Sequence, residues 1–232
     1  VRNDPKYEYG KSQISKIAVN LLFRYVDGCV FQTEDAKSYF NKKLQCKSRV
    51  ILNPVDEIFF KTKRSEYCSG IVTVGRLEAQ KNHKLLLQAY SNLLKRDKDI
   101  EDLYIYGDGS LKGELEEFVY KNRLKNKVHL LGKVSNVAEI LSKSKLFILS
   151  SDFEGLPNAL MEAMASGTPV VSTDCPCGGP KMLIKGRNVG ILVRCDDVKA
   201  LEEAINGVIY DKEKLKQMSV AVREAAKSFE SS

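Results

Sequence analysis

Short apolar runs alternate with segments of helical periodicity through most of the chain. The apolar runs predict strands at 70–74, 103–106, 128–131, 146–149, 169–172 and 190–193, and the segments between them predict helices near 84–95, 111–122, 137–141, 159–165 and 180–184. Two further helices are expected at 198–209 and 213–227. Mostly apolar strands that alternate with helices predict an α/β fold with a doubly wound, parallel six-stranded sheet covered on both faces. Ligands of such sheets bind at the carboxyl ends of the strands.

The first quarter of the chain shows a shorter version of the same alternation. Residues 1–12 are polar and predict a loop, 14–25 carry a helical apolar stripe, and 28–31 and 49–52 predict strands. Thr33 is expected to cap a helix after the first of these strands. We interpret this region as the end of a second α/β domain.

Composition and charge narrow the classes of function. The chain has 232 residues, 43% of them hydrophobic and 29% charged, which is ordinary for a globular protein, and no run is typical of a signal peptide or a membrane span. A net charge of +7 favours anionic partners, either a phosphate-bearing substrate or an anionic membrane surface. Nucleic acid is not expected, because no nucleic-acid-binding motif accompanies the charge.

The six cysteines favour a reduced, cytosolic setting, because a chain of this length does not need disulfides to fold. Cys175-Pro176-Cys177 invites a zinc hypothesis. We expect no metal site, since the two histidines, His83 and His129, belong to different predicted elements.

The segment after the strand at 146–149 carries two acids beside a helix start. Pro157 suits the first turn of the helix, and the backbone N–H groups of Gly155, Leu156 and Asn158 would be free to bind phosphate. Glu154 lies just before this turn and Glu162 about one turn into the helix, where their carboxylates could accept hydrogen bonds from sugar hydroxyls. The alternative is that Glu154 caps the helix and Glu162 is a solvated helix residue.

A second loop follows the strand at 70–74 and reads Gly75-Arg76-Leu77-Glu78-Ala79-Gln80-Lys81-Asn82. Gly75 would let the backbone approach a ligand closely. Arg76 could bind phosphate oxygens bidentately and Lys81 could act on them as a point charge, so this loop is a candidate diphosphate site. A solvated basic loop is the alternative.

The third glycine-rich loop, at 107–113, is a weak match to a dinucleotide-binding fingerprint. Its third glycine comes one residue late, and the next strand ends in Gly132 where an acid should bind a ribose. A dinucleotide-dependent oxidoreductase is therefore a minor alternative.

Glu154, seven intervening residues and Glu162, with the Glu-Gly-Leu-Pro-Asn turn, resemble the signature of retaining GT-B glycosyltransferases of family 4. The resemblance covers essentially the whole chain. Arg2-Asn3-Asp4-Pro5 and Asn53-Pro54-Val55-Asp56 match the end of the N-terminal GT-B domain and the linker. It implies that 1–56 belong to the acceptor-side domain and that 57–232 form a Rossmann-like domain that binds a nucleotide sugar.

The resemblance also implies an activity and roles for residues. The enzyme would move a hexose or N-acetylhexosamine from a nucleotide sugar, most simply a UDP-sugar, to a glycan or lipid-linked acceptor with retention of configuration. No cofactor or metal would take part. Arg76, Lys81 and Glu154 would be catalytic, and the donor would be bound by these three together with Gly75, Val134, Gly155, Leu156, Asn158 and Glu162. A cytoplasmic protein of bacterial polysaccharide biosynthesis, peripheral at the inner face of the membrane, is the expected setting.

The resemblance also implies that the chain would lack most of the acceptor-binding half that this family carries. The alternative to an active transferase is therefore a catalytically incomplete nucleotide-sugar-binding module, completed by a partner chain that supplies the rest of the N-terminal domain.

Overall fold

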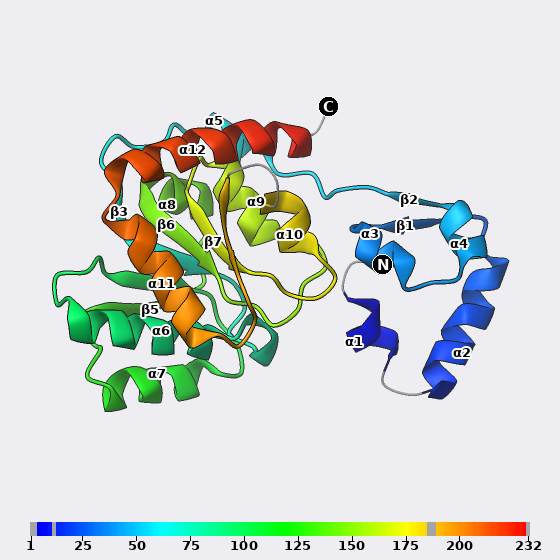
Figure 1. The fold of residues 1–232 in the computed structure, drawn as a ribbon, viewed down its shortest axis with the longest axis horizontal. Coiled ribbons are helices and arrows are strands. Elements are labelled where there is room, and N and C mark those ends of the chain that lie inside the picture. The colour runs from blue at the N-terminus through cyan, green and yellow to red at the C-terminus, as the bar shows by residue number, and fades with distance from the viewer. Residues whose placement is uncertain (1–3, 11–12, 185–188, 231–232) are drawn as a thin grey trace.

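The computed structural model describes residues 4–10, 13–184 and 189–230, and contains two parallel sheets (Figure 1). The strands are β1 (Cys29–Phe31), β2 (Ser48–Val50), β3 (Ser69–Val74), β4 (Leu103–Tyr106), β5 (Val128–Gly132), β6 (Ser144–Leu149), β7 (Val170–Thr173) and β8 (Gly190–Val193). Strands β1 and β2 form a two-stranded sheet, and the other six form one sheet in the order β5-β4-β3-β6-β7-β8. The predicted six-stranded parallel sheet is therefore confirmed.

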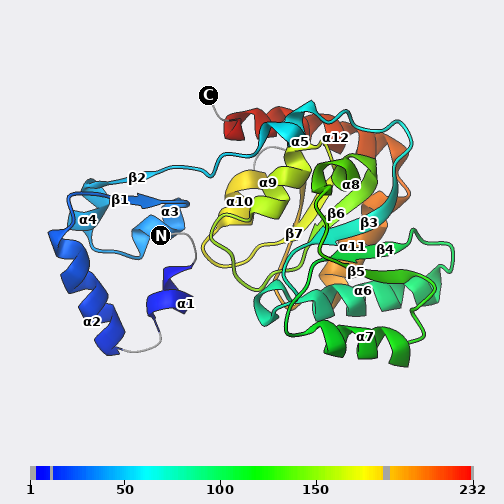
Figure 2. The same ribbon diagram turned by 180° about the vertical axis from the view of Figure 1, so that it is seen from behind.

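Helices cover both faces of the large sheet, as the two opposite views show (Figure 2). They are α6 (His83–Arg96), α7 (Lys112–Lys121) and α11 (Val198–Ile209) on one face, and α8 (Val137–Lys143), α9 (Asn158–Ala165) and α10 (Gly179–Ile184) on the other, with α12 (Lys212–Ala226) reaching both cores. Each face of the sheet has its own apolar core, and neighbouring strand residues alternate between them because side chains of a strand point to opposite faces. Ile71 packs into the core with α6, α7 and α11, and Val72 packs into the core with α8, α9 and α10. Within the described ranges, no helix combines the length and the hydrophobicity that a membrane span requires.

The strand order reverses between β3 and β6. Strand β3 pairs with β6 on one side and with β4 on the other, so the chain winds outward in both directions from this pair. In doubly wound sheets the crevice at such a switch point, at the carboxyl ends of the strands, is where ligands bind. The loops after β3 and β6 therefore define where a site is expected.

The N-terminal part carries short helices around the small sheet. These are α1 (Pro5–Tyr9), α2 (Gln13–Leu22), α3 (Glu34–Ser38) and α4 (Lys42–Cys46), and helix α5 (Glu57–Lys61) follows in the connection to the large sheet. The prediction of a loop at the start of the chain is wrong at Pro5–Tyr9, which form α1. Asp4 is the N-cap of this helix and accepts a hydrogen bond from Lys6 N, and Pro5 occupies the first turn. The first residues of the Arg2-to-Pro5 match lie outside the described residues.

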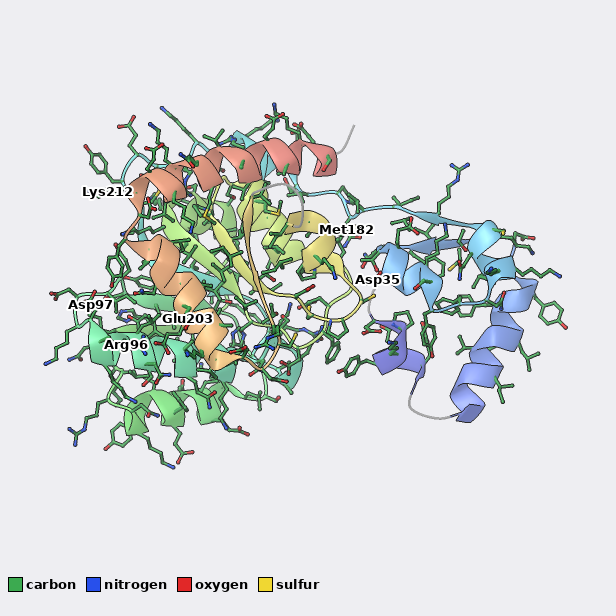
Figure 3. The ribbon with its side chains drawn as sticks, in the orientation of Figure 1. Asp35, Arg96, Asp97, Met182, Glu203 and Lys212 are labelled. Carbon is green, nitrogen blue, oxygen red and sulfur yellow. The ribbon has the colours of Figure 1, made fainter. Side chains whose placement is uncertain are left out.

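The N-terminal part contacts the large sheet through the loop before α10. Cys177 packs into the small apolar core around Phe31 and Phe40, and its thiol lies 3.4 Å from Thr33 Oγ1. Figure 3 shows Asp35 of α3 on the side that faces α10, where Met182 is labelled. Thr33 also caps α3 as predicted, accepting from Ala36 N at 3.0 Å.

Candidate functional site

Several hydrogen bonds hold the loops after β3 and β6 together. Asp152 N donates to Gln80 O and Ser150 Oγ donates to Lys81 O, each at 2.9 Å. The side chain of Gln80 spans the gap and donates to Phe153 O at 2.9 Å. These contacts fix the positions from which the side chains of Lys81 and Glu154 project.

Lys81 and Glu154 form a nearly buried ion pair at this junction. Lys81 Nζ lies 2.5 Å from Glu154 Oε1, and the side chains are 15% and 9% exposed. Ser151 Oγ donates to the same carboxylate oxygen at 2.8 Å. The alternative in which Glu154 caps α9 is wrong, because Pro157 is the N-cap and no side chain bonds there. The prediction that Pro157 is part of the first helical turn is wrong, because the helix begins at Asn158 and Pro157 precedes it.

Glu162 lies on α9, half-buried, on the same side as this pair. Burial raises the pKa of its carboxyl group, and the positive charge of Lys81 opposes that shift. No hydrogen bond to its carboxylate occurs among the described residues. The alternative of a solvated helix residue does not hold, and both carboxylate oxygens of Glu162 are available to a ligand with hydroxyl groups.

A cleft of about 230 Å³ opens beside this cluster at the ends of β3, β4 and β5. Its walls are formed by Val74, Gly75, Arg76, Tyr106, Gly107, Asp108, Lys133, Val134 and Val137. Arg76 is exposed, and its guanidinium group has no ion-pair partner in the part of the chain described. Lys81 passes close by, since a Cβ built on Gly75 would lie 3.5 Å from Lys81 Cε. The structure thus brings Gly75, Arg76 and Val134 to one cleft and places Lys81 at its border.

Glycines allow the loops around the cleft to lie against each other. Gly107 has φ +149°, and a Cβ on it would lie 1.8 Å from Gly75 O. Gly75 N donates to Tyr106 O at 2.9 Å and Gly107 N donates to Gly132 O at 2.8 Å. The glycines at 107 and 109 serve this packing of loop on loop, which explains the imperfect dinucleotide fingerprint in physical terms.

The turn before α9 presents unpaired donors. No hydrogen-bond acceptor is found for the backbone N–H groups of Gly155, Leu156 and Asn158 among the residues that the structure describes. Such a helix start attracts anions, because free N–H groups and the helix dipole both favour negative charge. Gly179 closes the other side of the turn: a Cβ there would lie 1.9 Å from Gly155 O. The side chain of Asn158 is exposed and accepts from Asn53 Nδ2 at 2.7 Å.

The buried side chain of His83 contacts the backbone of the loop that carries Arg76. It is 4% exposed, its Nε2 lies 3.2 Å from Arg76 O, and burial lowers its pKa to about 4. The ring is therefore neutral at neutral pH, with Nε2–H donating to the carbonyl. From the sequence, no site role was assigned to His83, Ser151, Gln80 or Gly179, because only the fold shows that they pack against site residues.

No group of three or more potential metal ligands occurs among the described residues. All six cysteines are free thiols. Burial raises the pKa of the Cys175 thiol, and raises that of Cys177 to about 11, so both stay protonated at neutral pH. The site as described offers cations, N–H donors and carboxylates, a set that suits a diphosphate bearing a sugar.

Comparison with known proteins agrees with this chemistry. The model of the family described as glycosyl transferases group 1 matches residues 54–225. An uncharacterized glycosyltransferase of Methanocaldococcus jannaschii is 33% identical over 207 residues, covering 82% of this chain and 50% of the relative. The Campylobacter jejuni alpha-1,4-N-acetyl-D-galactosaminyltransferase of GalNAc-alpha-(1->4)-GalNAc-alpha-(1->3)-diNAcBac-PP-undecaprenol is 32% identical over 229 residues, covering 96% of this chain and 61% of the relative. The chain thus spans roughly half to three fifths of the length of these curated relatives.

Solved structures share the fold at low identity. A variant of S. aureus TarM, solved with UDP, superposes with a TM-score of 0.84 at 21% identity, over 99% of this chain and 48% of that one. Anabaena HepE in complex with UDP and glucose gives 0.81 at 20% identity, over 95% of this chain and 64% of that one. The fold is that of GT-B glycosyltransferases. With the family match over most of its length, the chain belongs to the glycosyl transferases of group 1.

Proposed function

We propose that the chain binds a UDP-sugar at the carboxyl edge between β3 and β6. In this arrangement the diphosphate lies between the Arg76–Lys81 loop and the N–H groups of Gly155, Leu156 and Asn158. The sugar hydroxyls face Glu154, and the ribose hydroxyls face Glu162. The uracil enters the cleft beside Val134. The observation that carries this proposal is the placement of Lys81 beside the carboxylates of Glu154 and Glu162. Arg76 and the start of α9, for which the described residues provide no ion-pair or hydrogen-bond partner, lie next to them.

The reaction proposed is transfer of a hexose or N-acetylhexosamine with retention of configuration, as in family 4 of the glycosyltransferases. Arg76 and Lys81 would stabilise the charge that develops on the departing diphosphate, without a metal ion. Glu154 would hold the sugar by its hydroxyls while the glycosidic bond breaks. The support for a UDP donor comes from the UDP complexes of TarM and HepE, which share only the fold.

The acceptor proposed is a glycan or a lipid-linked glycan. Two Campylobacter jejuni relatives and one of Escherichia coli act on undecaprenol-linked acceptors, as their names state. The net charge of +7 would favour a cytoplasmic protein held peripherally at an anionic membrane surface. Binding to vesicles with and without anionic lipid tests this placement, and equal binding to both kinds of vesicle would contradict it.

A second candidate is a nucleotide-sugar-binding module without turnover of its own. In this candidate, a partner chain would supply the rest of the domain to which residues 1–56 are proposed to belong. Release of UDP from UDP-N-acetylglucosamine or UDP-glucose by this chain, with a synthetic polyprenyl-diphosphate glycan as acceptor, separates the two. Product formed with the donor's anomeric configuration by NMR supports the retaining transferase. Binding without any UDP release supports the module.

A further inference from the structure

The two oxygens of the Glu154 carboxylate have different surroundings. Oε1 receives both the Lys81 ammonium at 2.5 Å and the Ser151 hydroxyl at 2.8 Å. Oε2 receives, from the described part of the chain, only a long contact of 3.5 Å from Gln80 Nε2. The protein therefore occupies Oε1 and leaves Oε2 as the oxygen that can accept a strong hydrogen bond from a ligand.

Lys81 alone cannot set this orientation. An ammonium group is a compact charge with three rotatable donors, and it attracts either carboxylate oxygen equally. A serine hydroxyl has one proton to donate, and in Ser151 that proton is directed at Oε1. The direction of the carboxylate plane thus depends on the neutral hydroxyl.

Ser151 is itself held by the neighbouring strand. It is fully buried, and its carbonyl oxygen accepts from Thr173 Oγ1 at the end of β7 at 2.5 Å. Thr173 is also fully buried. A continuous set of hydrogen bonds therefore runs from the end of β7 through Ser151 to Glu154.

We propose that Ser151 is a positioning residue that turns Glu154 Oε2 toward the sugar of the bound donor. The inference rests on the proposed function, in which Glu154 contacts sugar hydroxyls. It adds that recognition of the sugar, but not of the nucleotide, depends on the Ser151 hydroxyl. A hydroxyl that merely satisfied the core would affect binding of UDP and of UDP-sugar alike.

The test is calorimetric titration of the wild-type chain and of Ser151→Ala with UDP, UDP-N-acetylglucosamine and UDP-glucose. We expect the dissociation constant of the preferred UDP-sugar to rise about tenfold in the variant, as for loss of a hydrogen bond to a charged group. The dissociation constant of UDP should change by less than about twofold, since less than half a kcal/mol would be lost.

Ser166→Ala is the matched control. Ser166 is equally buried, and it lies beyond the opposite end of α9. Its hydroxyl has no hydrogen-bond partner among the residues that the structure describes. This variant should bind UDP and UDP-sugar as the wild type does, which shows that loss of a buried hydroxyl alone does not change recognition.

Three results overturn the inference, and they differ in what they say about the proposed function. Ser151→Ala that keeps the wild-type preference for UDP-sugar over UDP contradicts the role of Ser151 and leaves the donor site intact. If the binding of UDP and of UDP-sugar weakens equally, Ser151 contributes to the stability of the fold and not to recognition of the sugar. A wild-type chain that binds neither contradicts the donor site itself.

Discussion

Arg76 and Lys81 are both cations of one loop, yet their surroundings differ. Arg76 is exposed and without an ion-pair partner among the described residues, whereas Lys81 is paired with the buried Glu154. Removal of a partner from a buried pair leaves an uncompensated charge. The two residues should therefore separate binding from stability.

Lys81→Ala should lower the free energy of unfolding by about 2 to 4 kcal/mol, because the Glu154 carboxylate loses its counter-charge. Arg76→Ala should change it by less than about 0.5 kcal/mol, as for other exposed residues, while lowering UDP affinity. Urea denaturation measures the first effect, with the exposed Lys84→Ala as control. Equal loss of stability in the Arg76 and Lys81 variants would contradict the assignment.

Glu162 should show a cost in stability that depends on pH. Burial raises its pKa above the unfolded value of 4.5, so the folded state binds more protons between these two pKa values. The free energy of unfolding should therefore fall as pH rises through that window, and the cost should persist at neutral pH. Glu162→Gln removes the titration. The variant should be more stable than the wild type near pH 7.5, and this gain should disappear near pH 4.

Urea denaturation at the two pH values measures this difference, and UDP titration of the same variant should show weakened binding. A gain in stability of equal size at both pH values would mean that the carboxyl group is not the cause. Higher stability together with weaker UDP binding in Glu162→Gln would mean that the Glu162 carboxylate serves the ligand and lowers the free energy of unfolding.

The charged residues of the candidate site could be located from the sequence, but the residues that hold them in position could not. Glu154, Glu162, Arg76 and Lys81 could be found because motif and spacing mark them. Ser151 could not, because nothing in the local sequence tells that a serine hydroxyl is buried against a carboxylate rather than facing water. The roles of the site residues stay predictions until binding is measured.

At the scale of elements, the site depends on how closely three loops approach one another. Gly107 lies with φ +149° directly against Gly75 O, so no side chain fits between the loops after β3 and β4. Displacement of Gly75 would move Arg76 with it. The backbone of these loops should therefore be as sensitive to substitution as the side chains of the site.

Gly107→Ala should destabilise the fold by about 2 to 4 kcal/mol and weaken nucleotide binding, because its Cβ would clash with backbone. Gly113→Ala is the control, since a Cβ at this position in α7 would meet nothing within 4 Å. That variant should be neutral or up to about 1 kcal/mol more stable, as alanine favours a helix. Thermal unfolding of the pair measures both effects, and similar melting temperatures would contradict the described loop packing.

The elements themselves could mostly be predicted from periodicity. Strands β4 and β8 and helix α11 begin and end where the pattern placed them, because their apolar positions are bounded by clear turn residues. Strand β2 ends at Val50, two residues earlier than expected. Helices α1, α4 and α5 were missed, since each has five residues, too few for a periodic signal, and each is marked only by its cap, Asp4, Asn41 or Asp56.

At the scale of the whole molecule, the N-terminal part and the large sheet meet beside the proposed sugar site. Tyr7 stacks on Phe153 with ring centroids 4.0 Å apart, and Asn53 bonds Asn158. Both partners on the large sheet belong to the segment around Glu154. Such long-range contacts could not be predicted from the sequence, because they depend on how two separately patterned segments pack. The division into 1–56 and 57–232 stays a prediction.

The proposed function depends on a UDP-sugar site between β3 and β6 that binds its ligand without a metal ion. Calorimetric titration with UDP, UDP-glucose, UDP-N-acetylglucosamine and NAD in EDTA tests it, for the wild type, Arg76→Ala and Glu162→Ala. We predict that the wild-type chain binds UDP in EDTA and does not bind NAD. UDP binding should weaken at least about tenfold in each variant, because each variant loses one charge-assisted contact. UDP binding that survives unchanged in both variants, or a folded wild-type chain that binds no nucleotide, would contradict the account.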